Sequence, residues 1–355
     1  MATITDVAES AGVSIATVSR ILNNTAVVSP TTRQRVLQAV SDLDYHPNQS
    51  ARNLRRNQTG VILILTPNMT NPFYASILQG IGDTASGLGF AAFICNTGDD
   101  TRRSTAALDR LLRHQADGAI TLSIGADDTW LSAYAEYPIV QCAEYQTSQQ
   151  LAHISIDNYA ASRDIMAYLL SLGHTRIAHI SADNAYYSTA ARLKGYIDAI
   201  DAAGLVVRPD YVAKGSADYS FASGKYQAQQ LLALDPRPTA IYCISDTLAL
   251  GAVVGAQEMG LRVPDDVSVT GFDNVTETEM IRPHLTTLAQ PCYELGCTAT
   301  QILDDLMSHR PTALERVLEH RLVIRESSAA APQGAPERLA GHQWPPSSKE
   351  EGDLP

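Results

Sequence analysis

Residues 6–20 of the chain read DVAESAGVSIATVSR. Apolar side chains recur at helical spacing on either side of Gly12, and a glycine at that position ends a helix after about two turns. Ser14 is suited to cap a second helix, which would run to about Leu22. Two short helices joined by a glycine-containing turn are typical of a helix-turn-helix, so this stretch predicts a DNA-reading unit.

The flanking residues extend this helical unit in both directions. Thr3 and Asp6 match a capping box for the first helix. Ser29 followed by Pro30 is a start signal for a third helix, which ends at residues 45–47. Helical spacing within that third helix is shown by Val36, Val40 and Leu43. The core expected for the first two helices consists of Val7, Ala8, Val13, Val18 and Ile21.

The second helix presents the candidate base-reading residues, because a helix of this kind enters the major groove with its N-terminal residues against base edges. Arg20 is suited to a bidentate bond with guanine, whereas Ile15 and Ala16 read shape and thymine methyl groups. The remaining side chains, suited to phosphate oxygens or lying on the same outer face, are Ser14, Thr17, Ser19 and Asn23.

The charge of the chain is unevenly distributed. Residues 1–60 hold six Arg against four Asp and Glu, a net charge of +2, although the formal charge of the whole chain is -12. The remainder therefore carries -14. A basic first segment on an acidic body indicates that the first segment meets a polyanion.

Length and composition exclude several classes of protein. A chain of 355 residues is expected to form two or three domains. No apolar run approaches the roughly 20 residues of a membrane span, and the N-terminal sequence MATITDVAES lacks the features of a secretory signal, so we expect a cytoplasmic protein. The five scattered cysteines do not suit a disulfide framework or a metal site, and we expect no cofactor.

From residue 61 onward, apolar runs alternate with helical stretches, which predicts parallel sheets with right-handed crossovers. The number of strands exceeds one comfortable sheet, so we divide this body into two α/β lobes. The runs are VILILTP (61–67), AAFIC (91–95), GAITLS (118–123), PIVQCAE (138–144), HISID (153–157), RIAHIS (176–181), TAIYCIS (239–245), VSVTGFD (267–273) and RLVIRES (321–327). Residues 327–355 have no period and little to bury, and we interpret them as disordered.

The pattern DVAxxAGVSxxTVSR resembles the signature of the lactose-repressor (LacI) family, and the resemblance covers about residues 3–327. It implies a two-lobed core like that of a periplasmic sugar-binding protein. It also implies that residues 48–55 form a hinge helix that folds on the operator, with Leu54 as a minor-groove wedge next to Ala51 and Arg55. The alternative for this segment is a solvated basic linker.

Ligands of such sheets bind outside the carboxyl ends of the strands, so polar and aromatic residues that follow the apolar runs are candidates for ligand contact. These candidates are Asn71, Phe73, Tyr74, Glu144, Tyr186, Ser188, Arg192, Tyr219, Asp246 and Asp273. The resemblance matches Arg192, Asp246 and Asp273 to polar cleft positions of the family. Carboxylates and Arg bond sugar hydroxyls in bidentate fashion, and aromatic rings stack on a base or a sugar face.

Some of these candidates have a structural alternative. Asp246 is equally suited to cap the helix that follows it. Tyr186 fits a surface loop, and Phe73 fits a core position. Arg192 and Asp273 are favoured as ligand residues.

Three further stretches resemble the purine and cytidine repressors of the family, the cytidine repressor more closely. They are RPTAIYCISDTLALG, GLRVPDDVSVTGFDN and LTTLAQPCYELG. Tyr186 stands where the purine-repressor pattern has an arginine, and Ala143 where it has an aspartate, which argues against a purine base. The resemblance therefore implies a nucleoside or a related sugar as effector.

The sequence thus predicts an α/β protein with an added all-α unit. A helix-turn-helix DNA-binding domain occupies residues 1–47, a hinge helix or linker 48–59, a two-lobed periplasmic-binding-protein-like core of parallel sheets 60–326, and a disordered tail 327–355. We expect a homodimeric transcription regulator, most simply a repressor, on a near-palindromic double-stranded DNA operator.

No nucleotide-binding, zinc-protease or serine-hydrolase motif occurs, so an enzyme is not expected. Two alternatives to a regulator remain open. One is a ligand-binding module whose N-terminal segment has lost its affinity for DNA, and the other is a sugar-modifying α/β enzyme.

Overall fold

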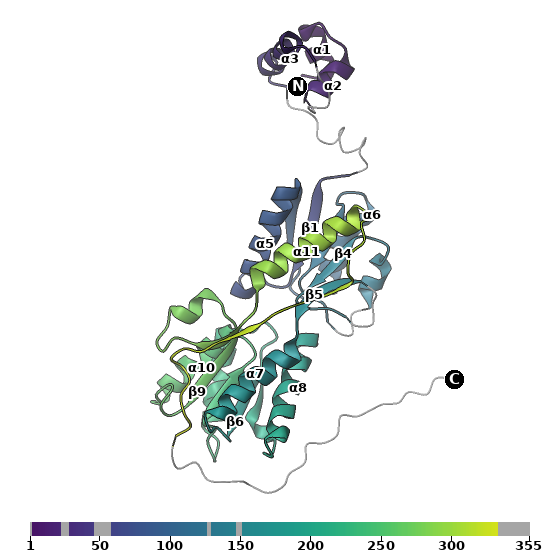
Figure 1. Ribbon diagram of the computed structural model, residues 1–355. Coiled ribbons are helices and arrows are strands. Elements are labelled where there is room, and N and C mark those ends of the chain that lie inside the picture. The colour runs from purple at the N-terminus through teal and green to yellow at the C-terminus, as the bar shows by residue number, and fades with distance from the viewer. Residues whose placement is uncertain (1, 23–27, 46–57, 126–128, 147–150, 333–355) are drawn as a thin grey trace, which may run out of the picture. The chain divides into compact units, whose positions relative to one another are not determined.

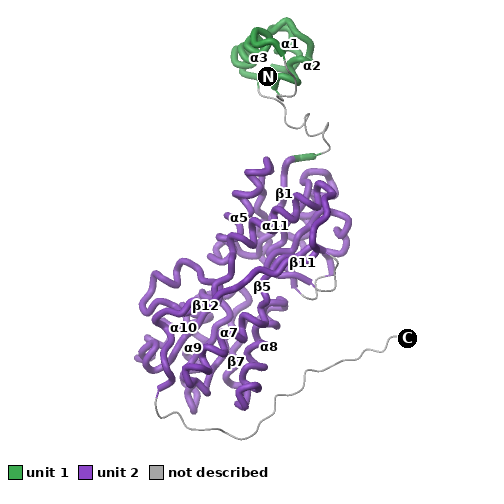
Figure 2. The backbone as a smooth tube through the Cα atoms, in the orientation of Figure 1, with its two compact units in different colours: residues 1–59 green, residues 60–355 purple. Residues whose placement is uncertain are grey.

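The computed structural model describes residues 2–22, 28–45, 58–125, 129–146 and 151–332. Two compact units divide the chain, residues 1–59 and residues 60–355 (Figure 2). No helix among the described residues is long and apolar enough to cross a membrane.

The first unit contains three helices, α1 (Ile4–Ala11), α2 (Ile15–Leu22) and α3 (Pro30–Asp42). The predicted capping box is present, because the side chains and backbones of Thr3 and Asp6 bond reciprocally. Gly12 has φ +61° and ends α1 in the left-handed conformation. The hydroxyl of Ser29 accepts a bond from the backbone of Thr32 at the start of α3, as its position before Pro30 predicted.

The predicted core of this unit is confirmed. Val7, Val18 and Val36 are fully buried, and Ile21 is nearly so. Val13, Val40 and Leu43 pack against them at its margin. The three helices share this small core. Their buried apolar contacts fix the position of α2 relative to α1.

The second unit is built on two six-stranded sheets. In lobe 1 the strand order is β11-β5-β4-β3-β1-β2, and in lobe 2 it is β12-β10-β9-β8-β6-β7. Every strand pair is parallel except β10 with β12. The lobe 1 strands are β1 (Val61–Thr66), β2 (Ala91–Asn96), β3 (Gly118–Thr121), β4 (Ile139–Cys142), β5 (Ala152–Ile156) and β11 (Glu315–Leu318). The lobe 2 strands are β6 (Ile177–Ala182), β7 (Val212–Gly215), β8 (Ala240–Cys243), β9 (Ser268–Asp273), β10 (Thr286–Ala289) and β12 (Arg321–Val323).

Helices cover the faces of the sheets, as crossover connections require. They are α5 (Pro72–Leu88), α6 (Thr101–Leu112) and α11 (Cys292–Met307) in lobe 1, and α7 (Asn158–Ser171), α8 (Tyr187–Ala202), α9 (Phe221–Leu232) and α10 (Asp246–Glu258) in lobe 2. Short 3-10 helices occur at Trp130–Tyr134, Pro209–Tyr211 and Thr276–Glu279. Each of the nine apolar runs contains a strand of the structure, which confirms the parallel α/β prediction.

Close contact between helices α5 and α11 depends on two glycines. A Cβ on Gly80 would lie 2.2 Å from the carbonyl oxygen of Tyr293, and a Cβ on Gly296 would lie 2.2 Å from that of Ile77. Both distances are shorter than any normal contact, so only glycine permits this approach of the two backbones.

Three segments carry the chain between the lobes. Asp157 joins β5 to α7, residues 290–291 join β10 to α11, and residues 319–320 join β11 to β12. Figure 1 shows β11 and β12 as parts of one extended segment that passes from one sheet to the other. We call these segments the first, second and third crossovers.

The sequence did not identify β10 and β11. Neither β10 (TTLA) nor β11 (ERVL) is a continuous apolar run, and β11 is an exposed edge strand. The tail prediction placed its start too early. Ser327 is fully buried, its hydroxyl bonds the carbonyl of Val269, and the backbone of Ala331 still bonds that of Leu172. Residues 333–355 lie outside the described residues.

Candidate functional site

A cleft between the two lobes of the second unit gathers most of the predicted ligand residues. Its lining consists of Asn71, Phe73, Tyr74, Ala143, Glu144, Ser188, Arg192, Tyr219, Ser245, Asp273 and Gln290. The space open to the centres of water molecules is about 20 Å³, which suits roughly one water. The lining side chains of the two lobes therefore approach one another closely in this structure, and a ligand larger than a water molecule requires them to move apart.

The lining residues converge because they follow the carboxyl ends of parallel strands in both sheets. Asn71 and Phe73 come after β1, Glu144 after β4, Ser188 after β6 and Asp273 at the end of β9. Asn71 caps helix α5, since its carbonyl oxygen Oδ1 accepts a bond of 3.0 Å from the backbone of Phe73. The cap fixes the start of α5 at the cleft wall.

Aromatic rings form part of the wall. Phe73 and Tyr74 contact edge to face, with ring centroids 5.1 Å apart. Tyr219 adopts φ +58°, and its hydroxyl accepts a bond of 2.9 Å from the amide of Asn184. These rings provide flat apolar surfaces on which a base or a sugar face could stack.

Glu144 connects the lobes across the cleft. Its carboxylate accepts hydrogen bonds from the hydroxyl of Ser188 and, at 3.2 Å, from the backbone N–H of the same residue. Burial raises the pKa of the Glu144 carboxyl to about 7, because the bonds from Ser188 and the charge of Arg192 only partly offset the loss of solvation. A carboxyl in this state serves as a hydrogen-bond acceptor or donor, depending on pH.

Arg192 is the buried cation of the cleft. Its Nε donates to Asn158 Oδ1 at 2.9 Å, and its Nη1 donates to the carbonyl of Ile244 at 2.6 Å. The guanidinium carbon lies 3.6 Å from the ring centroid of Phe272, so the side chain is stacked as well as bonded. These contacts fix the orientation of the guanidinium group of Arg192, which faces the cleft.

Asp273 lies in an unusual backbone conformation. Its φ is +115°, and that of Asn274 is +62°, both in the left-handed region that glycine favours. One carboxylate oxygen accepts a bond of 2.8 Å from the amide of Gln290. Burial raises the pKa of Asp273, while Arg192 opposes that shift. Backbone strain of this kind is commonly kept at binding sites, where the surroundings enforce it.

Asp246 does not lie where the sequence suggested. It is fully buried, and its two carboxylate oxygens accept bonds from Thr287 Oγ1 at 2.5 Å and from the backbone of Val275 at 2.9 Å. Ser245 caps α10 instead, and Asp246 is absent from the cleft lining. The cap interpretation is wrong, and the carboxylate supports the strained turn behind the cleft. Burial and the neighbouring Asp273 raise its pKa.

Tyr186 also lies outside the lining, and the alternative of an exposed surface residue is wrong because the residue is only 6% exposed. Its hydroxyl donates to Asp99 Oδ1 of the opposite lobe at 2.5 Å. Phe73 is half-buried and lines the cleft rather than lying inside the core. Apart from Asp246 and Tyr186, all the candidates line the cleft, eight in total with Phe73 included.

Sequence reasoning missed Ser245 and Gln290 among the lining residues and treated Ala143 only as a departure from a pattern. Gln290 directly follows β10, the strand that the apolar pattern did not reveal. Ser245 is the last residue of the run TAIYCIS and was passed over for the charged Asp246 beside it. The strand-end rule would have found Ser245 had the strand been ended at Cys243, but it could not find Gln290 because β10 was not identified.

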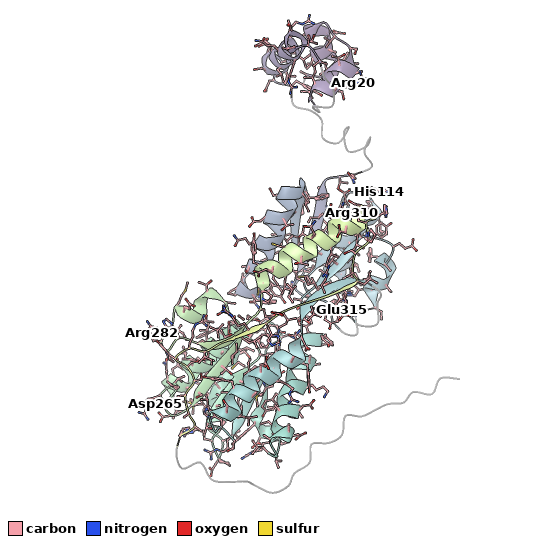
Figure 3. All side chains as sticks on the ribbon, in the orientation of Figure 1. Arg20, His114, Asp265, Arg282, Arg310 and Glu315 are labelled. Carbon is pink, nitrogen blue, oxygen red and sulfur yellow. The ribbon has the colours of Figure 1, made fainter. Side chains whose placement is uncertain are left out.

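The candidate DNA-reading residues lie on or directly before α2. Ser14, Ile15, Ala16 and Arg20 are exposed, and Thr17 and Ser19 are half-buried. Figure 3 marks Arg20 on the first unit. Ser14 caps the helix, because its Oγ accepts a bond of 3.2 Å from the backbone of Thr17. Ile15 is 43% exposed. Asn23, Ala51, Leu54 and Arg55 lie outside the described residues.

Comparison with known proteins agrees with this division. The family model described as bacterial regulatory proteins, lacI family, matches residues 3–48, and the model for a periplasmic binding protein-like domain matches residues 166–328. The HTH-type transcriptional repressor CytR of Escherichia coli is 37% identical over 336 residues, covering 93% of this chain and 97% of that protein. Catabolite control protein A of Priestia megaterium is 35% identical over 330 residues, covering 92% and 99%.

Solved structures match over the same span. The lac repressor dimer bound to operator and the anti-inducer ONPF is 29% identical and superposes with a TM-score of 0.84, covering 93% of this chain and 99% of that one. The regulator CelR in complex with cellobiose is 30% identical with a TM-score of 0.71, covering 92% and 100%.

This chain belongs to the lacI family of bacterial regulatory proteins. It is therefore a helix-turn-helix DNA-binding transcriptional regulator with a ligand-binding core, and its family is not one of enzymes. The resemblance noted from the sequence is confirmed.

Proposed function

We propose that this regulator is a homodimeric repressor. Its affinity for a near-palindromic operator is controlled by a nucleoside or related sugar that binds in the cleft. The observation that carries the effector class is the convergence of Glu144, Arg192 and Asp273 on one closed cavity. Two carboxylates and a guanidinium provide paired acceptors and donors for vicinal hydroxyl groups. Phe73 and Tyr219 provide stacking surfaces for a ring.

Relatives with known ligands support a hydroxyl-rich effector. One solved relative holds cellobiose, and another, a regulator from Enterococcus faecium that is 27% identical with a TM-score of 0.68, holds ribose. We narrow the class to ribosyl compounds on the resemblance of residues 237–251 and 260–274 to the cytidine repressors. A purine base remains disfavoured, because Tyr186 and Ala143 replace the residues of the purine-repressor pattern.

Edge strand β2 supports a homodimer. It is paired only with β1 in its sheet, and its side chains Phe93 and Ile94 are 55% and 43% exposed. An exposed apolar edge strand promotes aggregation of a monomer, and it is normally covered by another part of the chain or by a partner. A two-fold symmetric pair would place two copies of α2 on successive half-sites of one operator, which is why we expect near-palindromy.

The DNA contacts follow from α2 and the segment after the first unit. We assign base reading to Arg20, Ile15 and Ala16, and phosphate contacts to Ser14, Thr17, Ser19 and Asn23. Ala51, Leu54 and Arg55 are proposed as the hinge helix, with Leu54 as the wedge. We expect the protein to act in the cytoplasm, where bacterial DNA is found.

Calorimetry on the purified full-length protein with cytidine, uridine, adenosine and D-ribose tests the effector class. One member should bind, and Asp273→Asn should weaken that binding by about tenfold or more, since each charged hydrogen bond contributes about 1.5–3 kcal/mol. Asp265→Asn, on the exposed surface of lobe 2, is the matched control. Failure of every member to bind would contradict the ribosyl assignment.

Selection from random duplexes tests the DNA-binding half of the proposal. A palindromic motif should emerge, and operator affinity should fall with salt at a log–log slope of about -0.9 per phosphate contacted. Leu54→Ala should weaken binding and reduce bending of the operator. The absence of any selected motif would contradict the operator proposal.

A further inference from the structure

Two buried amide side chains lie where the chain crosses between the lobes. Asn158 directly follows the first crossover, and Gln290 is part of the second. Both are nearly inaccessible to solvent, at 2% and 9% exposure. We call these two residues the crossover amides.

Each crossover amide bonds one of the charged cleft residues. Asn158 Oδ1 accepts from Arg192 Nε at 2.9 Å, while the amide nitrogen of Asn158 donates to the carbonyl of Ile156 in β5 of the opposite lobe at 3.4 Å. Arg192 is thus linked to both ends of the first crossover through a single side chain.

The second crossover amide, Gln290, forms two hydrogen bonds with Asp273. Gln290 Nε2 donates to Asp273 Oδ1 at 2.8 Å, and the backbone N–H of Gln290 donates to the carbonyl of Asp273 at 3.3 Å. The carbonyl of Gln290 in turn accepts from the backbone of Cys292, the first residue of α11 in lobe 1. The strained turn at Asp273 is therefore tied directly to the segment that enters the other lobe.

The third crossover lacks such a connection. There His320 Nε2 lies 2.9 Å from the carboxylate of Asp164 on α7, and neither residue lines the cleft. The contrast between the crossovers provides an internal control, because all three join the lobes and only the first two are bonded to charged residues of the cleft.

We propose that Asn158 and Gln290 are positioning residues that convert occupation of the cleft into a change of crossover geometry, and so of DNA affinity. The proposal rests on the proposed function, in which the effector binds Arg192 and Asp273. An effector that bonds these two side chains changes their position relative to the amides, and the amides are parts of the crossovers. Rotation between lobes needs only a few backbone dihedral angles at such segments.

The test uses the full-length dimer and three variants. Gln290→Met keeps the length of the side chain and removes the donor, Asn158→Ala removes the acceptor, and His320→Gln changes the third crossover as the control. Operator affinity is measured with and without a saturating concentration of the panel member that binds the wild type most tightly. Saturation separates loss of coupling from loss of effector affinity, which matters because Gln290 also lines the cleft.

In the wild type we expect the effector to change operator affinity by about 5–150-fold, the usual range for such coupling. In Gln290→Met and Asn158→Ala the change should fall to about threefold or less, whereas His320→Gln should retain the wild-type value. Wild-type coupling in both amide variants, each at full occupancy by calorimetry, would overturn the proposal.

Small-angle X-ray scattering without any effector gives a second readout. Gln290→Met removes the side-chain bond to Asp273 and keeps the backbone bond, so the second crossover should be less constrained and the radius of gyration should increase relative to wild type and His320→Gln. If no panel member binds the wild type, the ribosyl proposal fails, while a larger radius in the variant would still support the role of the amides. An unchanged radius together with unchanged thermal stability would remove that support.

Discussion

The carboxylate of Glu144, which follows β4 in lobe 1, accepts two hydrogen bonds from Ser188, which lies in the first turn of α8 in lobe 2. The two preceding residues also reach across the cleft. The hydroxyl of Tyr186 bonds Asp99, and the ring of Tyr187 lies 4.6 Å from that of Tyr145. Three consecutive residues at the start of one helix therefore hold the lobes together.

The first prediction concerns pH. The pKa of Glu144 is raised from 4.5 to about 7 by burial in the closed, folded core. The folded state therefore binds more protons than the unfolded state between these values, and the free energy of unfolding falls as pH rises from about 4.5 through about 7. Burial raises the pKa of Asp273 as well, which gives a slope of the same sign.

Thermal unfolding measured at several pH values checks this prediction. Glu144→Gln should flatten the dependence of stability on pH, because one titrating group is lost. Ser188→Ala removes a donor that lowers the pKa of Glu144, so the decline in stability should extend to higher pH than in the wild type. A slope that is the same in Glu144→Gln and wild type would exclude Glu144 as its source.

The second prediction concerns the bond between Tyr186 and Asp99. Tyr186→Phe removes the donor without changing the ring, and should lower the stability of the closed core by about 0.5–1.5 kcal/mol. Because a closed cleft must open before a ligand enters, stopped-flow measurements should also show faster effector association. A double-mutant cycle with Asp99→Ala isolates the pair, and a coupling energy near zero would show that the bond contributes nothing.

The third prediction concerns base reading. Arg20→Ala should relax the preference at one base pair of each half-site, at a cost of about 1–3 kcal/mol for the preferred base. Arg35→Ala removes the same charge from an exposed position on α3 and should leave the selected motif intact. Selection from random duplexes with both variants makes the comparison, and an unaltered motif in Arg20→Ala would remove this residue from the list of base readers.

The fourth prediction concerns the contact between α5 and α11. Gly296→Ala would place a methyl group against the carbonyl oxygen of Ile77, and we expect a loss of about 1–3 kcal/mol or more from overpacking. Gly82 lies on α5 with open space around it, so Gly82→Ala should stabilise the helix by about 0.5–1 kcal/mol. Urea unfolding of the two variants should shift the midpoint in opposite directions. Equal shifts would mean that helix propensity, rather than close approach, sets the need for Gly296.

Sequence alone determined the features whose causes are local. The helices around Gly12 and Ser14 were predictable because capping residues and apolar spacing act within one or two turns. Nine strands were predictable because each lies in an apolar run, and seven of them are buried on both faces, as such a run predicts, whereas β2 and β12 are exposed edge strands. The rule that ligands meet the carboxyl ends of strands then located eight of the ten cleft candidates.

Tertiary structure decided the features that depend on residues far apart in the chain. Asp246 and Gln290 are 44 positions apart, and their local sequences do not show that the first supports a turn while the second faces the cleft. Asp99 and Tyr186 meet only because two sheets built from different parts of the chain face each other. Local patterns encode helices and strands, whereas the partners of a buried polar group are set by which elements pack together, and that packing belongs to the whole fold.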